Sequence, residues 1–264
     1  MIKSLYTTAT GMKAQQTMVD TIANNIANVN TAGFKRSQVS FEDLLYVTLK
    51  TPGLERDAGG VASPIGVQIG SGAQLSGTSK IYTTGVLEAT NRPLDLAIEG
   101  DGFFQVRLPD GGNGFTRDGH LQRNSEGRLV TSGGEVIQPE INIPNDAIEI
   151  SIDAEGRVSG RTAGNPDTTA TFGQLQLARF VNPSGLLALG GNILRQTDAS
   201  GPPTPNNPGS NGLGTLKQNF IERSNVEIVN ELVNLIVAQR AYEVNSRAIQ
   251  ASDQMLSTAT SVIR

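Results

Sequence analysis

Three carboxylates lie close together in the middle of the chain, at Asp95, Glu99 and Asp101. Paired carboxylates can act as general acid and base, and clustered carboxylates can bind a cation. In an extended strand Asp95 and Glu99 would face the same side, but Gly100 predicts a turn directly after them. The pattern therefore favours a solvated strand edge over a catalytic pair or a metal site.

His120 is the only histidine of the chain. A histidine can act as a general base, but no serine or cysteine nucleophile motif accompanies this one, and it follows a glycine turn. The sequence predicts an exposed turn residue. A phosphate loop would need a strand-to-helix context and a following Gly-Lys-Ser/Thr, which are missing around glycines 100, 102, 111, 112 and 114. We therefore expect no catalytic, cofactor-binding or metal-binding residues.

The composition narrows the classes of partner. The chain has 264 residues, enough for one or two domains, but hydrophobic residues make up only 37% and glycine is frequent. We expect such a chain to bury little apolar surface alone and to gain the rest by assembling. Its net charge of −4 comes without a basic stripe, which argues against nucleic acid as a partner.

The chain has no cysteine, which excludes a disulfide framework and a thiolate metal site. The first residues contain no apolar core of a signal peptide. The most apolar window, 226–238, includes Asn230, Glu231 and Asn234, so it is too short and too polar to span a membrane. We expect a protein without a cleaved signal peptide and without membrane insertion.

The last forty residues, 224–264, predict a long helix. Ser224 and Glu227 have the spacing of a capping box, and Glu243 and Arg247 have the spacing of an i,i+4 ion pair. Large apolar residues recur every seven positions, the period of a coiled-coil seam, at Ile228, Leu235, Tyr242, Ile249, Leu256 and Ile263. Small or polar residues recur between them at Ala238, Asn245, Ser252 and Ala259.

Residues 2–29 predict a second helix with the same period, and Gly33 is a candidate left-handed cap. The two terminal helices either fold back onto the central domain or pair with each other. A pair would leave apolar residues on its outer side, which need further neighbours: Ile22 and Val29 on the first helix, and Val229, Val233 and Ile236 on the last.

The residues between the helices predict a connector and a β-rich domain. The stretch 41–49 is compatible with a short helix or a strand, and the alternation of Val67, Ile69, Ala73 and Leu75 favours extended chain. From 79 to 195, short apolar runs alternate with glycine turns, typical of an all-β domain. Residues 198–214 are rich in Pro, Gly and Asn and predict a linker.

The predicted fold class is α+β, with long N- and C-terminal helices, an extended connector and a central all-β domain; these patterns leave open whether the helices are paired as a coiled coil. The boundaries follow from these patterns. We expect a terminal helical domain of 1–35 and 222–264, a connector of 36–80 and 198–221, and a β-rich domain of 81–197.

Several motifs resemble those of bacterial flagellar rod and hook proteins: residues 23–35 (ANNIANVNTAGFK), 94–106 (LDLAIEGDGFFQV), 115–122 (FTRDGHLQ), 239–248 (QRAYEVNSRA) and 253–256 (DQML). Within that family the resemblance is greatest to distal rod proteins. The length of the chain fits a distal rod protein. The stretch that begins at 41–46 and continues to about residue 65 is one that hook proteins lack. In addition, no large outer domain is inserted in the middle of the chain.

The resemblance implies a structural subunit rather than an enzyme. Paired terminal helices would form the inner tube of a hollow helical polymer, a drive shaft that transmits torque from motor to hook in motility. The implied location is the periplasmic rod of the basal body, reached through the flagellar type III export apparatus. The implied partners are copies of the chain itself, proximal rod proteins, hook protein, the rings around the rod and the export apparatus.

The resemblance and the apolar patterns together predict which residues form the polymer interface. They are Leu5, Met12, Val19, Ile22, Ile26 and Val29 in the first helix, and Ile228, Leu232, Leu235, Ile236, Tyr242, Asn245, Ile249, Leu256 and Ile263 in the last. The stretch 46–65 is predicted to be specific to the rod and to wedge between subunits. Two alternatives stay open: a hook or proximal-rod subunit, and a secreted β-rich enzyme or carbohydrate-binding protein with helical arms.

Overall fold

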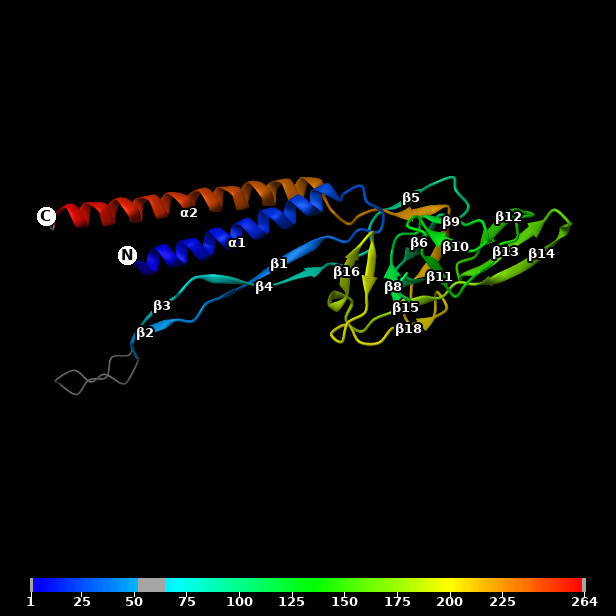
Figure 1. Cartoon of the computed structure of the whole chain (residues 1–264), viewed down its shortest axis with the longest axis horizontal. Helices are drawn as coiled ribbons and strands as arrows, with labels where there is room; N and C mark the ends of the chain where they lie inside the picture. The colour runs from blue at the N-terminus through cyan, green and yellow to red at the C-terminus, as the bar shows by residue number, and fades with distance from the viewer. Residues whose placement is uncertain (1, 52–64, 263–264) are drawn as a thin grey trace. The chain divides into compact units, whose positions relative to one another are not determined.

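The computed structural model describes residues 2–51 and 65–262 (Figure 1). The chain forms two compact units. The first takes its described residues from 1–26, 37–79 and 228–264, and the second consists of 27–36 and 80–227. The predicted α+β class is confirmed, because the two helices belong to the first unit and most strands belong to the second.

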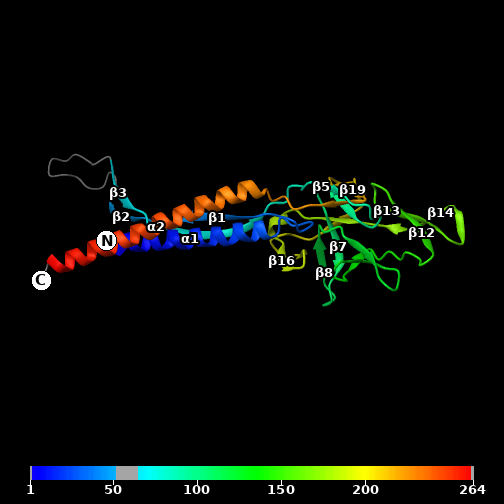
Figure 2. The same cartoon turned by 90° about the horizontal axis from the view of Figure 1, so that it is seen from above.

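Two antiparallel helices lie side by side in the first unit, α1 (Ile2–Ala27) and α2 (Ile228–Val262) (Figures 1 and 2). A side chain on Gly11 would come within 3.1 Å of the Asn245 Nδ2 atom, so these two positions face each other. Counted from this level, α2 extends past the first residue of α1 by about eight residues, or roughly 12 Å. The predicted pairing of the terminal helices is confirmed.

The start of α2 differs from the prediction, because the helix begins at Ile228 and not at Ser224. The Ser224 hydroxyl accepts a hydrogen bond from the Val226 N–H instead of capping a helix. Asn225 explains the delay. Its side chain accepts a hydrogen bond from the Arg36 N–H and donates one to the Ile81 carbonyl, which fixes the chain before α2 in a non-helical conformation.

The connector forms two short antiparallel ribbons in the first unit. Strand β1 (Ser37–Asp43) pairs with β4 (Ala73–Lys80), and β2 (Val47–Lys50) pairs with β3 (Val67–Ile69). The predicted extended chain is confirmed, and the stretch 41–49 contains no helix but the end of β1, a short loop and the beginning of β2.

One face of α1 lies against these ribbons. The Lys3 ammonium donates to the Ile69 carbonyl, and the Asn25 side chain forms two hydrogen bonds with the backbone of Ser37. Gly72, with φ +113°, approaches Thr10 so closely that a Cβ atom there would lie 2.1 Å from the Thr10 hydroxyl. Helical periodicity places Lys3, Thr10 and Asn25 on one face of α1.

The second unit is β-rich, as predicted. Its main nine-stranded sheet has the order β16-β17-β8-β7-β11-β10-β9, with β15 and β18 off this path. Strands β12, β13 and β14 form a three-stranded sheet, and β19–β6 and β20–β5 form two pairs. The bounds are β5 Leu87–Ala89, β6 Leu96–Glu99, β7 Phe103–Arg107, β8 Asn113–Thr116, β9 Leu121–Arg123, β10 Leu129–Thr131, β11 Val136–Gln138, β12 Ala147–Ile152, β13 Arg157–Thr162, β14 Asn165–Gln174, β15 Leu177–Arg179, the 3-10 turn η1 Pro183–Gly185, β16 Leu187–Gly190, β17 Ile193–Arg195, β18 Thr204–Asn206, β19 Thr215–Gln218 and β20 Phe220–Glu222.

The prediction that residues 198–214 are a linker is wrong. Strand β18 pairs with β15, and β19 pairs in full with β6. Leu213 and Leu216 are buried in the main core of the second unit. The Pro and Gly residues thus serve the turns between these short strands, and the segment belongs to the β-rich unit rather than to the connector.

Candidate assembly surface

The three carboxylates do not form a chemical site. Glu99 and Asp101 are exposed, as predicted. Asp95 is fully buried, so the prediction of a solvated edge is wrong for this residue. Its carboxylate lies 3.7 Å from the Arg92 Nε atom and, among the described residues, has no hydrogen-bond partner. Within those residues no group of three or more acidic or His side chains is arranged to hold a metal ion.

His120 is half-buried rather than exposed. Its Nδ1 atom lies 2.9 Å from the Asp118 carboxylate, and its backbone forms an isolated β-bridge with Asp95. The Asp118 carboxylate also accepts the His120 backbone N–H, so the histidine is held in a turn.

The glycine-rich turn between β6 and β7 binds a cation with its carbonyl groups. Arg117 donates hydrogen bonds to the carbonyls of Ile98, Gly100 and Gly102, at 3.3, 2.8 and 3.0 Å. Carbonyl oxygens directed at a guanidinium present negative dipole ends, whereas phosphate loops present N–H groups. The turn therefore binds the Arg117 guanidinium rather than a phosphate.

Arg117 belongs to a buried ionic cluster with Lys35 and Glu222. Arg117 Nε lies 2.8 Å from one Glu222 carboxylate oxygen, and Lys35 Nζ lies 2.5 Å from the other. The Gly85 N–H and the Thr83 carbonyl complete the hydrogen bonding of the Glu222 and Lys35 side chains. The cluster joins the segment after α1, the β-rich sheet and the strand before α2.

The cluster contains two cations and one carboxylate, so its charge is not balanced from within. Burial lowers the pKa of Lys35, and the nearby Arg117 lowers it further, against the opposing effect of Glu222. The Gly33 N–H also donates to the Glu222 backbone carbonyl, and Gly33 has the predicted left-handed conformation, with φ +69°. This arrangement fixes chain segments to one another and presents no reactive group to solvent.

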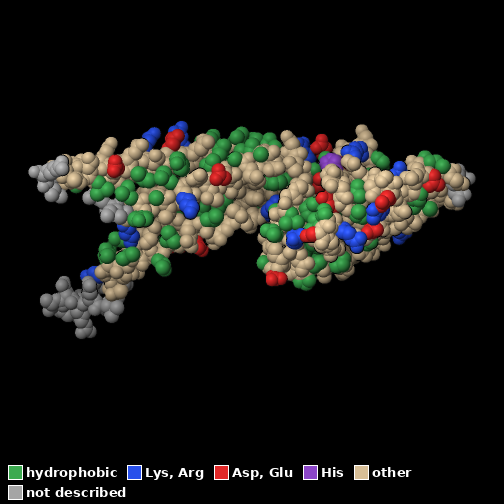
Figure 3. All heavy atoms as spheres, viewed as in Figure 1, with side chains coloured by type: hydrophobic (Ala, Val, Ile, Leu, Met, Phe, Trp, Pro, Cys, Tyr) green, Lys and Arg blue, Asp and Glu red, His purple; other side chains and the backbone are tan. Residues whose placement is uncertain are grey.

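The first half of α2 carries an exposed apolar stripe, visible as hydrophobic surface in Figure 3. Its residues follow the i, i+3, i+4, i+7 spacing of one helix face. Val229 is 73% exposed and Ile236 57% exposed, which is unusual for such side chains. We call this set, Val229, Leu232, Val233, Ile236 and Val237, the α2 stripe.

The structure divides the predicted interface residues into three groups. Leu232, Ile236, Ile228 and Tyr242 are exposed. Ile22 is buried, so the prediction that it lies on the outer side of the pair is wrong. The others that the structure describes are half-buried, namely Leu5, Met12, Val19, Ile26, Val29, Leu235, Asn245, Ile249 and Leu256, and Ile263 lies outside the described residues.

The buried side of α2 is lined by its small and polar row. Glu231, Ala238 and Ser252 are buried, at the seven-residue period of that row. Small side chains at this row let two helix backbones approach closely. The predicted Glu243–Arg247 pair does not occur among the described contacts, because Glu243 pairs with Arg240 at 3.2 Å instead.

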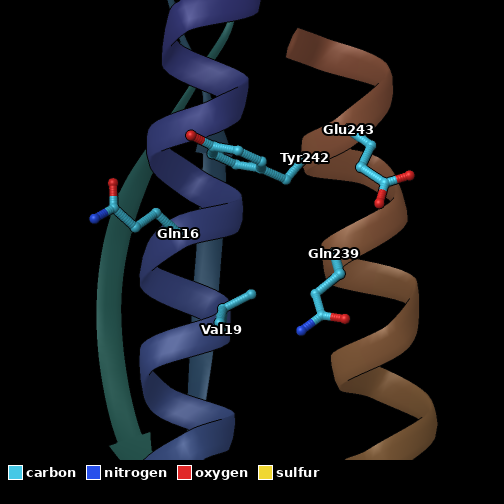
Figure 4. A pocket seen from close by; sticks show the side chains of 5 residues that line it. All are labelled: Gln16, Val19, Gln239, Tyr242 and Glu243. Carbon is cyan, nitrogen blue, oxygen red and sulfur yellow. The ribbon is translucent and has the colours of Figure 1, made fainter. Parts of the chain in front are cut away.

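A groove of about 410 Å³ lies between α1 and α2. Val19 and Tyr242 give it apolar walls, and Gln16, Gln239 and Glu243 form its polar rim. Figure 4 shows the Val19, Gln239 and Tyr242 side chains directed into the space between the helices.

The ribbons carry a second exposed apolar surface. Leu45, Tyr46, Val47 and Leu49 are exposed on the outgoing chain, and Leu45 is 89% exposed. Ile65, Val67 and Ile69 are exposed on the returning chain. Residues 52–64 of the predicted rod-specific stretch lie outside the described residues.

Lys35 and Arg117 lie within the quoted sequence motifs, but no sequence pattern indicates a role for either of them. Glu222 is not among the residues predicted from the sequence. A charged residue inside an apolar strand, here Phe-Ile-Glu at 220–222, is the signal that could have identified it.

Three family models match separate parts of the chain. They are described as flagella basal body rod protein (residues 5–35), flagellar hook protein FlgE/F/G D1 domain (97–160) and flagellar basal body rod FlgEFG protein C-terminal (217–262). Each matched segment contains one member of the ionic cluster.

Full-length relatives are more specific. The chain is 48% identical over 256 residues to flagellar basal-body rod protein FlgG of Buchnera aphidicola subsp. Schizaphis graminum, across 97% of this chain and 98% of that protein. It is 45% identical over 271 residues to FlgG of Borreliella burgdorferi, across the whole of both. Flagellar hook protein FlgE of Helicobacter mustelae is 43% identical over 140 residues, which cover only 30% of that protein. The chain therefore belongs to the family of flagellar basal-body rod proteins FlgG, the structural subunits of the distal rod of the bacterial flagellum.

Proposed function

We propose that this chain polymerises with copies of itself into the hollow periplasmic shaft that carries torque from the motor to the hook. The observation that carries the proposal is the α2 stripe. Five large apolar side chains of one helix are exposed in the isolated chain, and the opposite side of the same turns carries the buried residues Glu231 and Ala238. A surface of this kind marks an interface.

The stripe supplies a driving force of useful size. Covering a half-exposed Val, Leu or Ile side chain contributes about 1 kcal/mol, so a covered stripe contributes roughly 5 kcal/mol per subunit before the entropy cost of association. A single contact of that strength is weak, but a polymer repeats it along every subunit. The repeated contact must be heterologous, because a two-fold contact would end growth.

The groups that first suggested chemistry have structural roles, which supports a structural function over a catalytic one. The glycine turn binds Arg117, and His120 is held by Asp118. Within the described residues, no helix is long and apolar enough to cross a membrane.

The proposed partners are those of the rod within the basal body: proximal rod proteins on one side, hook protein on the other, and the rings around the shaft. Delivery by the flagellar export apparatus, without a cleaved signal peptide, is part of the same proposal. The hook relative supports the rod over the hook as the place of this chain, because it lacks a match over about half of the chain.

The exposed residues of β2 and β3 support a further part of the proposal, in which the 46–65 stretch wedges between neighbouring subunits and keeps the shaft straight. Deleting residues 51–65 should leave polymers that are curved or less stiff in electron micrographs. Straight polymers of unchanged stiffness would count against this role.

The decisive experiment places a charge in the stripe. Val233→Asp or Ile236→Asp should abolish polymers in sedimentation and electron microscopy and should abolish motility when it replaces the native chain. Gln250→Asp is the matched control, because Gln250 is an exposed polar residue further along α2, and it should assemble normally.

Circular dichroism of each variant shows whether the fold survives. Polymers from either stripe variant that match those of the control would refute the proposal. A soluble monomer that binds a saccharide or turns over a substrate would support the secreted binding protein or enzyme instead.

A further inference from the structure

The chain passes between its two units more than once, and the second unit holds every crossing point. The second unit consists of 27–36 and 80–227, and the chain enters or leaves it at both ends of each range, at four points. Helix α1 ends at Ala27 and α2 begins at Ile228, so both helices continue directly into segments of this unit.

Hydrogen bonds join these segments to one another close to the crossing points. The Arg36 N–H donates to the Asn225 side chain, and the Arg36 carbonyl accepts the Ile81 N–H. The Asn225 amide in turn donates to the Ile81 carbonyl and to the Thr83 hydroxyl, at 2.8 and 2.9 Å. Asn225 therefore joins the segment after α1, the segment that starts at Lys80 and the segment before α2. We call Arg36, Ile81, Thr83 and Asn225 the junction network.

A second set of contacts holds the segment before α2 beside the segment after α1. Arg223 donates a hydrogen bond of 2.8 Å to the Asn30 side chain across 193 positions of sequence. The Gly33 N–H donates to the Glu222 carbonyl at 2.8 Å. Because these partners are so far apart in sequence, unlinked helix ends would meet only by closing a very long loop, at a large cost in entropy. In the folded second unit that loop is already closed.

The link before α2 is an extended chain. Ser224 and Val226 are buried, whereas Arg223 and Glu227 are exposed, which is the alternation of extended structure. Ser224 and Glu227 have the capping-box spacing that would start a helix here, but the hydrogen bonds of Asn225 prevent it. Winding the link into the helix from Asn225 onward would shorten it by roughly 5 Å. Asn225 therefore sets the length of the link that carries α2.

We propose that Asn225 is a positioning residue that holds the adjoining ends of α1 and α2 together, so that the folded β-rich unit promotes the pairing of the two helices within one chain. Joined ends turn pairing into an encounter of neighbouring segments and raise the effective concentration of one helix for the other. An asparagine suits this role because its amide accepts from the Arg36 N–H and donates to the Ile81 carbonyl at the same time. The role belongs to the single chain and does not depend on the proposed polymer.

An intrachain disulfide measures this effect, because the chain has no cysteine of its own. Gly11→Cys and Asn245→Cys place two thiols at facing positions of α1 and α2, where a Cβ atom on residue 11 lies 3.6 Å from the Asn245 Cγ atom. A glutathione redox buffer gives the effective concentration of the two thiols in dilute, full-length monomer. Adding Asn225→Ala should lower this concentration about tenfold, while urea unfolding shows that the β-rich unit stays folded.

Asn182→Ala is the matched control. Asn182 also donates from its side chain to a backbone carbonyl of the second unit, that of Ala199 at 3.0 Å, outside the junction network. This variant should keep the effective concentration that the two thiols have without it. An equal concentration with and without Asn225→Ala would overturn the proposal, and so would an equal decrease in Asn182→Ala.

A milder variant covers the case in which Asn225→Ala unfolds the β-rich unit. Asn30→Ala removes only the exposed hydrogen bond between Asn30 and Arg223, and it should lower the effective concentration severalfold while the unit stays folded. An unchanged concentration in Asn30→Ala would refute the proposal in that case.

Discussion

Arg117 Nε donates a hydrogen bond of 2.8 Å to the Glu222 carboxylate across 105 positions of sequence. The same carboxylate receives Lys35 from 187 positions away. All three side chains are almost inaccessible to solvent. One carboxylate thus ties the segment that leaves α1 to the strand that precedes α2, within the β-rich unit.

Glu222→Gln should strongly destabilise the second unit. The substitution keeps the shape but removes the anion, so Lys35 and Arg117 are left as uncompensated buried charges. Breaking a buried pair in this way costs about 3–5 kcal/mol. Urea unfolding of the full chain, followed by the circular dichroism of the β-rich unit, measures the loss.

The control for this prediction is Glu140→Gln. Glu140 forms an exposed ion pair of 3.0 Å with Arg107, and removing such a pair costs less than about 1 kcal/mol. Equal losses of unfolding free energy in the two variants would show that burial of the ionic cluster contributes nothing to the stability of the second unit.

Because the Tyr82 phenol is largely buried, we expect the folded protein to lose stability at alkaline pH. Burial raises the pKa of Tyr82 to about 12, although the charge of Arg117 acts in the opposite direction. In the unfolded chain the phenol loses its proton near pH 10, so the folded state binds more protons between about pH 10 and 12 and is destabilised as the pH rises through that window. The raised pKa corresponds to about 2–3 kcal/mol.

Tyr82→Phe should therefore flatten the decline of stability in this window and change little at neutral pH. Unfolding midpoints in urea across the window measure the effect. Tyr6→Phe, which removes an exposed phenol from the first unit, is the control. Parallel curves for Tyr82→Phe and the unmodified chain would refute the assignment.

Gly72→Ala should detach the ribbon locally from α1. The new Cβ would meet the Thr10 hydroxyl, and the φ of +113° strains any L side chain, for a cost of about 1–3 kcal/mol. Amide exchange in β1 and β4 should rise. Gly77→Ala, where an added Cβ meets nothing within 4 Å, should leave exchange unchanged. Protection that is equal in both variants would contradict the packing of the ribbon on α1.

Asp95→Asn should stabilise the β-rich unit by about 1 kcal/mol, because a buried carboxylate without a hydrogen-bond partner among the described residues pays the cost of desolvation. Thermal unfolding measures the shift, and Asp198→Asn is the exposed control. A large loss of stability would instead reveal that the Asp95 carboxylate accepts a hydrogen bond from an ordered water or coordinates a cation.

The sequence predicts the helices well because their seven-residue period depends on local spacing alone. The first helix and Gly33 are confirmed within two residues. The alternation of apolar residues at Val67 and Ile69 also predicts the extended connector. The two matching periods leave open whether the helices pair, and the resemblance to flagellar rod and hook proteins decides for the pair.

Other features depend on contacts that are distant in sequence. Asn225 delays α2 because it bonds to Arg36 and Ile81, which no local pattern announces. Residues 198–214 look like a linker, yet β18 and β19 find partners in β15 and β6. In the sequence, Glu222 and Asp95 resemble ordinary surface carboxylates. Only the folded structure shows that both are buried. The role of the predicted interface residues stays a prediction, because it concerns other copies of the chain.

The stagger between the helix ends makes the two ends of the polypeptide unequal. The last turns of α2 extend beyond the first residue of α1, so within the described residues no turn of α1 lies beside them, whereas every described turn of α1 has α2 alongside. Deleting the projecting turns shortens the molecule but leaves the contact between the two helices intact. Trimming the same length from the beginning of α1 uncovers the turns of α2 that follow Asn245, so losses at the two ends should be tolerated very differently.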